Sequence, residues 1–128
     1  MPHKFKTVLI VEDDHDVRVT LRQVYEAAGF YVFTVTNGHS AMELLNIIPA
    51  PKLILCDLRM PLMDGITFIK NKSSDKSLKD VPLIIMSAFH EHFPDFPGIT
   101  CLPKPLDLFQ LIKHSEDSIK KENLISKR

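Results

Sequence analysis

Three short, almost wholly apolar runs constrain the fold more than any other feature of the chain. They are well separated in the sequence: Thr7–Val11 (TVLIV), Leu53–Cys56 (LILC) and Leu83–Met86 (LIIM). A strand with one wet face alternates apolar and polar side chains, whereas a strand buried on both faces is apolar throughout. The runs therefore predict the central strands of a parallel sheet that is covered by helices on both sides.

The segments between these runs predict an alternation of strands and helices. Tyr31–Thr36 is rich in β-branched and aromatic residues, and Ile99–Leu102 predicts a weaker fifth strand. Apolar residues recur at helical spacing within residues 17–28, 41–48, 66–69 and 108–119. This alternation predicts an α/β domain with right-handed crossovers. Phe89–Gly98 contains two prolines and has no helical period, so we expect a shortened or irregular helix there.

Length and charge exclude several classes of protein. The 128 residues suit one domain, which we assign to residues 1–119, followed by a charged tail or helix extension at 120–128. Sixteen basic residues balance sixteen acidic ones, so the excess positive charge typical of nucleic-acid binding is missing. No apolar run is long enough for a signal peptide or a membrane span. We therefore expect a cytoplasmic protein that contacts neither membrane nor nucleic acid directly.

Acidic, hydroxyl and basic residues follow the predicted strands at the points where those strands end. Glu12 and Asp13 follow the first strand, Asp57 follows the third, Ser87 the fourth and Lys104 the fifth. In an open parallel sheet the carboxyl ends of the strands meet at one edge, and ligands bind there. The sequence therefore predicts a site in which these side chains converge.

The residue types at this edge point to phosphoryl chemistry. Carboxylates held close together repel one another unless a cation joins them, and oxygen ligands select a hard cation such as Mg2+. A carboxylate at Asp57, beside such a cation and Lys104, is equipped to attack phosphorus and form an acyl phosphate. Lys104 would offset charge on the phosphoryl oxygens, and Ser87 would donate a hydrogen bond to them.

Four segments of the chain together resemble a known family. They are VLIVEDD (Val8–Asp14), LILCDLRMPLMDG (Leu53–Gly65), IIMSA (Ile84–Ala88) and PKP (Pro103–Pro105). In this order they resemble the receiver domain of two-component response regulators, over essentially the whole chain. The resemblance implies a flavodoxin-like three-layer sandwich with a five-stranded parallel sheet in the order 2-1-3-4-5.

The resemblance also implies roles for individual residues in a metal site. Asp57 corresponds to the phosphoacceptor, and Glu12 and Asp13 correspond to acids that hold Mg2+ (or Mn2+) together with Asp57. The backbone carbonyl of Arg59 corresponds to a further metal ligand.

The remaining implied roles concern switching and partners. Ser87 corresponds to the switch hydroxyl and Lys104 to the lysine that pairs with the phosphoryl group, with a cis peptide bond expected at Pro105. The family implies a histidine kinase or a histidine phosphotransfer protein as donor, and a downstream protein or output domain as recipient of the signal. Such a domain is a phosphoacceptor rather than an enzyme, limited to Mg-dependent self-phosphorylation and slow self-dephosphorylation.

The chain departs from the family pattern at several places. Cys101 stands where the family usually has an aromatic residue, and the interval from Ser87 to Lys104 is shorter than usual. The shorter interval predicts a reshaped face that does not form the family's common symmetric dimer. A bulky Phe89 predicts slow self-dephosphorylation. In the implied strand order, Cys56 and Cys101 flank the fourth strand, roughly 10 Å apart and too far for a disulfide.

One alternative function stays open at this point. A pseudo-receiver that is never phosphorylated would keep the fold as a constitutive protein-interaction module. Cys101 and the shortened helix favour this alternative, whereas the intact acidic residues and Lys104 oppose it.

Overall fold

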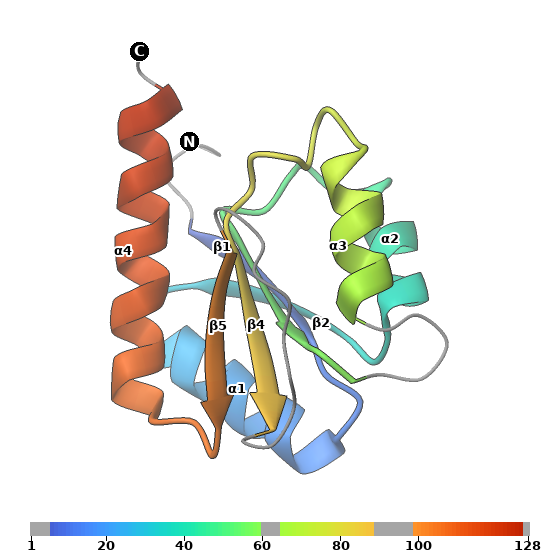
Figure 1. Cartoon of the computed structure of the whole chain (residues 1–128). Coiled ribbons are helices and arrows are strands. Elements are labelled where there is room, and N and C mark those ends of the chain that lie inside the picture. The colour runs from blue at the N-terminus through green and yellow to red at the C-terminus, as the bar shows by residue number, and fades with distance from the viewer. Residues whose placement is uncertain (1–5, 60–64, 89–98, 127–128) are drawn as a thin grey trace.

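The computed structural model, shown in Figure 1, describes residues 6–59, 65–88 and 99–126. Its elements, in chain order, are β1 (Thr7–Val11), α1 (His15–Ala27), β2 (Tyr31–Val35), α2 (Gly38–Leu45), β3 (Leu53–Asp57), α3 (Gly65–Ser73), β4 (Leu83–Ala88), β5 (Ile99–Lys104) and α4 (Leu108–Ser126). The strands form one parallel sheet in the order β2-β1-β3-β4-β5. The predicted fold class and strand order are therefore confirmed.

Helices cover both faces of the sheet, which explains the wholly apolar strands. Helices α2 and α3 lie on one face, and α1 and α4 lie on the other (Figure 1). Successive strand residues point to opposite faces, so Leu9 packs toward α2 and α3 while Ile10 packs toward α1 and α4. Both side chains are 0% exposed. Each central strand thus contributes to two separate cores.

Side-chain caps fix where the helices begin. The Asp14 carboxylate accepts a hydrogen bond from the Val17 amide at 3.0 Å, and Asn37 accepts one from the Ser40 amide at 2.8 Å. These bonds satisfy amides that lack a partner within the helix. Asp107 caps α4 in the same way, because its carboxylate accepts a bond of 3.1 Å from the Gln110 amide.

Three strands continue beyond the apolar runs that predicted them. β3 includes Asp57, β4 reaches Ala88 and β5 reaches Lys104. Backbone pairing continues because Asp57 lies opposite Met86 and Lys104 lies opposite Ala88. Three polar residues of the predicted site, Asp57, Ser87 and Lys104, therefore belong to the sheet and are held by its backbone hydrogen bonds.

Gly65 allows α3 to begin directly against the end of β3. A Cβ atom at this position would lie 2.9 Å from the Cα atom of Leu58, which is closer than real contacts permit. The Gly65 amide donates to the Leu58 carbonyl at 2.8 Å. This close approach fixes Leu58, the residue directly after Asp57.

The remaining predictions about the fold have different outcomes. Cys56 and Cys101 lie opposite Ile85 on its two sides, and no disulfide joins them, as expected. The expected cis peptide bond is present between Lys104 and Pro105. The irregular helix and the reshaped face were predicted for Phe89–Gly98, which lies outside the described residues. Among the helices that the structure describes, none combines the length and apolar character needed to cross a bilayer.

Candidate functional site

The acidic residues predicted from the sequence meet at the carboxyl edge of the sheet. Glu12 and Asp13 follow β1 and Asp57 ends β3, and one carboxylate oxygen of each lies within 4.8 Å of the others. Glu12 is 0% exposed and Asp57 is 6% exposed, whereas Asp13 is exposed to solvent. Three carboxylates are therefore gathered in a site that opens toward water on one side.

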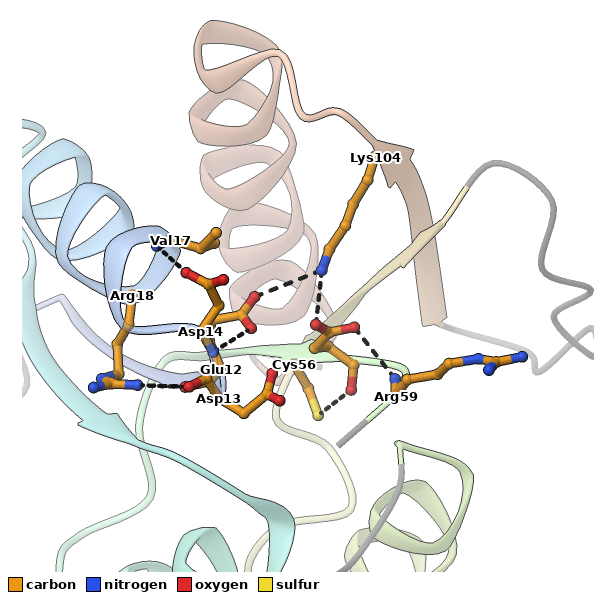
Figure 2. Close-up of polar contacts among 9 residues, drawn as sticks. Glu12, Asp13, Asp14, Val17, Arg18, Cys56, Arg59 and Lys104 are labelled. Carbon is orange, nitrogen blue, oxygen red and sulfur yellow. Dashed lines mark hydrogen bonds and ion pairs between the residues drawn. The ribbon is translucent and has the colours of Figure 1, made fainter. Parts of the chain in front are cut away.

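Lys104 reaches into this acidic cluster from the end of β5. Its Nζ atom lies 2.7 Å from Asp57 Oδ2 and 3.7 Å from Glu12 Oε1. Dashed lines run from the end of the Lys104 side chain to the acidic residues in Figure 2. The shorter contact is a charge-assisted hydrogen bond and the longer one is an ion pair only. The other oxygen of Asp57, Oδ1, accepts a hydrogen bond of 3.2 Å from the Arg59 amide.

Glu12 Oε1 is a buried side-chain oxygen that lacks a hydrogen bond, and among the side chains of the described residues it is the one polar atom with this property. The other oxygen, Oε2, accepts a hydrogen bond of 3.1 Å from the Asp14 amide. Buried carboxylate oxygens are nearly always hydrogen-bonded, so an orphan oxygen beside two further carboxylates suits a site that binds a cation. A set of hard oxygen donors fits a divalent cation such as Mg2+.

Burial and charge pairing have opposite effects on the pKa values of the charged groups in the site. Burial raises the pKa of Glu12 to about 7, and the negative charge of Asp57 adds to the rise, while the Asp14 amide and Lys104 oppose it. Burial alone would lower the pKa of Lys104, but its hydrogen bond to Asp57 and the nearby acids raise it on balance. The lysine therefore stays charged, and Glu12 holds its proton readily when no cation is bound.

Ser87 lies at the same edge, but its hydroxyl is engaged elsewhere. It is 5% exposed, and its Oγ atom lies 3.4 Å from the Sγ atom of Cys101 on the neighbouring strand. Cys101, a residue that departs from the family pattern, is therefore a partner of the Ser87 hydroxyl. The role predicted for Ser87 toward a phosphoryl group stays a prediction, as does the metal role of the Arg59 carbonyl.

Sequence reasoning missed one residue that contacts the site. Arg18, one turn into α1, folds back so that its Nη1 atom donates to the carbonyls of Glu12 at 3.0 Å and Asp13 at 3.3 Å (Figure 2). A basic residue on the first turns of a helix that follows an acidic loop is the signal that could have indicated this contact.

Comparison with known proteins agrees with this geometry. A family model described as the response regulator receiver domain matches residues 8–116. The chain belongs to this family. It is 30% identical over 120 residues to sporulation initiation phosphotransferase F of Bacillus subtilis, and the match covers 89% of this chain and 90% of that protein. A receiver domain is a phosphoacceptor module of two-component signalling rather than a conventional enzyme.

Solved structures of receiver domains superpose closely on this one. The receiver domain of a signal transduction histidine kinase from Syntrophus aciditrophicus gives a TM-score of 0.80 at 25% identity, covering 91% of both chains. The receiver domain of the sensor histidine kinase PA1611 from Pseudomonas aeruginosa gives 0.81 at 20% identity, covering 91% of this chain and 98% of that one. The second was solved with a magnesium ion coordinated in its active-site cleft.

Proposed function

We propose that this receiver domain accepts a phosphoryl group on Asp57, in the presence of Mg2+, from the phosphohistidine of a histidine kinase or phosphotransfer protein. One observation carries the proposal: Lys104 Nζ lies 2.7 Å from Asp57 Oδ2, beside the orphan oxygen Glu12 Oε1. The contact places the nucleophile, Asp57, next to the positive charge of Lys104. The Glu12 oxygen offers a metal ligand that has no hydrogen bond within the protein.

The chain's own residues account for the chemistry at phosphorus. A carboxylate oxygen of Asp57 forms a bond to phosphorus as the bond from phosphorus to the donor's ring nitrogen breaks, and that nitrogen keeps the bonding electron pair. The product is an aspartyl phosphate and a free histidine. Lys104, already within 2.7 Å of Asp57, offsets the charge on the phosphoryl oxygens.

Four groups would hold the cation: the carboxylates of Glu12, Asp13 and Asp57 and the backbone carbonyl of Arg59. When bound, Mg2+ would neutralise negative charge on the phosphoryl oxygens and lower the repulsion between them and the acids. The orphan oxygen of Glu12 and the mutual distances within 4.8 Å support this assignment. The magnesium ion in the PA1611 receiver domain supports the choice of metal.

Ser87 would report phosphorylation to the rest of the domain. In the structure its hydroxyl contacts Cys101 Sγ at 3.4 Å, which is a weak hydrogen bond. Phosphoryl oxygens on Asp57 are far stronger acceptors, so the hydroxyl would turn toward them and leave Cys101. The resulting change at β4 and β5 would alter the surface that a downstream protein or output domain recognises.

A hollow beside Lys104 supports docking of the phosphate donor at α1. It has a volume of about 360 Å3 and a mostly apolar lining, formed by Val17, Thr20, Leu21, Pro105, Leu106 and Leu108 together with Asp16 and Lys104. An apolar side chain of the donor that fills this hollow would place its phosphohistidine near Asp57.

Intact-mass measurement after incubation with Mg2+ and acetyl phosphate tests the proposed acceptor. We expect an adduct of about 80 Da, the mass of one phosphoryl group, on the native chain and none on Asp57→Asn. Asp14→Asn is the matched control, because it removes a neighbouring carboxylate while asparagine keeps the helix cap. Absence of the adduct from the native chain would instead favour the pseudo-receiver, the constitutive interaction module.

Transfer from a phosphorylated histidine phosphotransfer protein tests the docking site. Thr20→Glu places a charge in the apolar hollow, whereas Gln23→Glu adds the same charge to an exposed position on α1 outside it. Thr20→Glu should slow transfer from the protein donor but leave the reaction with acetyl phosphate unchanged. Equal slowing by both variants would argue against docking in the hollow.

A further inference from the structure

The loop that carries two of the proposed metal ligands is held from outside the sheet by an arginine. Glu12 and Asp13 lie between the end of β1 and the start of α1. The Nη1 atom of Arg18 donates to the backbone carbonyl of Glu12 at 3.0 Å and to that of Asp13 at 3.3 Å. Its Nη2 atom lies 3.3 Å from Nδ1 of His15. In Figure 2 the Arg18 side chain lies beside Glu12 and Asp13, on the side away from Lys104.

These contacts constrain how the two carboxylates are presented. The Glu12 amide already donates to the Val35 carbonyl at 3.1 Å, so Arg18 binds the opposite end of the same residue. A backbone held at both its amide and its carbonyl has little freedom to rotate, and the Cα–Cβ bond moves with it. Because Glu12 is 0% exposed, its carbonyl also needs a donor from the protein.

The contacts that Arg18 makes distinguish positioning from charge neutralisation. Within the described ranges, the guanidinium bonds two carbonyls and an imidazole and forms no ion pair with the acidic cluster. The positive charge of Arg18, considered alone, repels Mg2+ and so lowers the affinity of Glu12 and Asp13 for the metal. Loss of the charge would therefore tighten metal binding, whereas loss of the hydrogen bonds would weaken it.

We propose that Arg18 is a positioning residue for the metal site, which acts by fixing the peptide groups that present the carboxylates of Glu12 and Asp13. The inference rests on the proposed Mg2+ site. Arg18 would therefore raise the affinity for Mg2+ through its hydrogen bonds, although its charge alone would lower that affinity.

Isothermal titration with Mg2+ tests the proposal on Arg18→Met, which removes charge and donors but keeps the chain's length. Arg22→Met is the matched control: Arg22 lies one turn further along α1, where it pairs with Glu26 at 3.6 Å and not with the loop. Arg18→Lys keeps the charge and one donor group. Thermal melting of each metal-free variant establishes the temperature at which all of them are folded for the titration.

We expect Arg18→Met to raise the dissociation constant for Mg2+ about tenfold, the lower end of the range for groups that orient metal ligands. Arg22→Met should change it by less than about twofold, because an exposed charge one turn away is screened. Arg18→Lys should fall between the native chain and Arg18→Met. With acetyl phosphate, Arg18→Met should need more Mg2+ for half-maximal rate but reach the native rate at saturation.

Two results would overturn the inference. Mg2+ binding by Arg18→Met that equals or exceeds that of the native chain would show that only the charge matters. A loss of the saturating rate without a change in Mg2+ affinity would place Arg18 in some other role. Failure of the native chain to bind Mg2+ is a separate result, since it would refute the proposed metal site itself and this inference with it.

Discussion

Two buried charged groups lie at opposite ends of the sheet, and their surroundings differ in one respect. Glu12 lies at the carboxyl edge with its Oε1 atom lacking a hydrogen bond. Lys72, near the end of α3, is 5% exposed and its Nζ atom donates to the carbonyl of Lys79 at 3.1 Å. It lines a cavity of about 530 Å3 at the amino ends of β4 and β5, together with Asp80 and Glu122.

The difference is between a buried charge whose partners all come from the fold and one that the fold leaves without a hydrogen bond at one oxygen. Burial lowers the pKa of Lys72, and the negative charges of Asp80 and Glu122 oppose that shift. Its ammonium group thus has both a hydrogen-bond partner and counter-charges within the fold. Glu12 has Lys104 at 3.7 Å but two further acids as neighbours, so the fold alone does not satisfy it. A buried charge therefore indicates a binding site only when the protein leaves it unsatisfied.

Replacement of Glu12 should give the largest effect, because it should weaken Mg2+ binding while it raises the stability of the metal-free fold. Glu12→Gln removes a charged ligand, so we expect the dissociation constant for Mg2+ to rise about a hundredfold. At about pH 8, the metal-free variant should be more stable than the native chain by roughly 1–3 kcal/mol, because glutamine has no charge to desolvate at this position. Titration calorimetry and urea denaturation measure the two effects.

The matched variant for this comparison is Lys72→Met, which removes the other buried charge. Its dissociation constant for Mg2+ should stay within about twofold of the native value. Lys72 and the acids lie at opposite ends of the sheet, so salt screens the effect of its charge on the metal site. Weaker Mg2+ binding in Lys72→Met than in Glu12→Gln would break the distinction between the two groups.

The pH dependence of stability gives the next effect. Because burial raises the pKa of Glu12 from 4.5 to about 7, the folded chain binds a proton more tightly than the unfolded chain. The free energy of unfolding of the metal-free protein should therefore fall as the pH rises through this window, by up to about 3 kcal/mol. Denaturation at a series of pH values measures this trend, which Glu12→Gln should abolish and saturating Mg2+ should offset.

The fold could be predicted from the sequence because its main determinants are local and periodic. Wholly apolar runs such as Leu83–Met86 indicate strands buried on both faces, and the two cores on either side of the sheet confirm this. Strand ends could not be predicted as well. Asp57 and Lys104 belong to β3 and β5 although they are charged, because backbone pairing does not depend on side-chain polarity.

The sequence predicted which side chains meet at this edge better than the contacts that they make there. The convergence of Glu12, Asp13, Asp57 and Lys104 follows from the rule that strand ends share an edge, and the distances among these side chains agree with it. The contact of Arg18 with the loop carbonyls could not be predicted, because it depends on the rotamer of a long side chain. The pairing of Ser87 with Cys101 likewise depends on which neighbour the hydroxyl faces.

Truncation of Lys72 should have a smaller effect on stability than the change of pH. Lys72→Ala removes the donor to the Lys79 carbonyl and leaves a cavity, so we expect a loss of about 2 kcal/mol. Lys72→Met fills the same space without a charge to desolvate, and its stability should lie within about 1 kcal/mol of the native chain. Urea denaturation compares the two variants, and equal losses would show that the ammonium group itself stabilises the fold.

The contact between Ser87 and Cys101 should give the smallest effect, because both partners are neutral. A thiol is a weak hydrogen-bonding group, and Cys101 is only half-buried, so Cys101→Ala should cost less than about 1 kcal/mol. Cys56→Ala is the control at the same distance across Ile85. It should cost more, because Cys56 is 0% exposed and packs in the core against α2 and α3. Urea denaturation compares the two variants. A larger loss for Cys101→Ala than for Cys56→Ala would show that this neutral pair stabilises the carboxyl edge of the sheet. That result would contradict the view that satisfied and unsatisfied charges are the main distinction at this site.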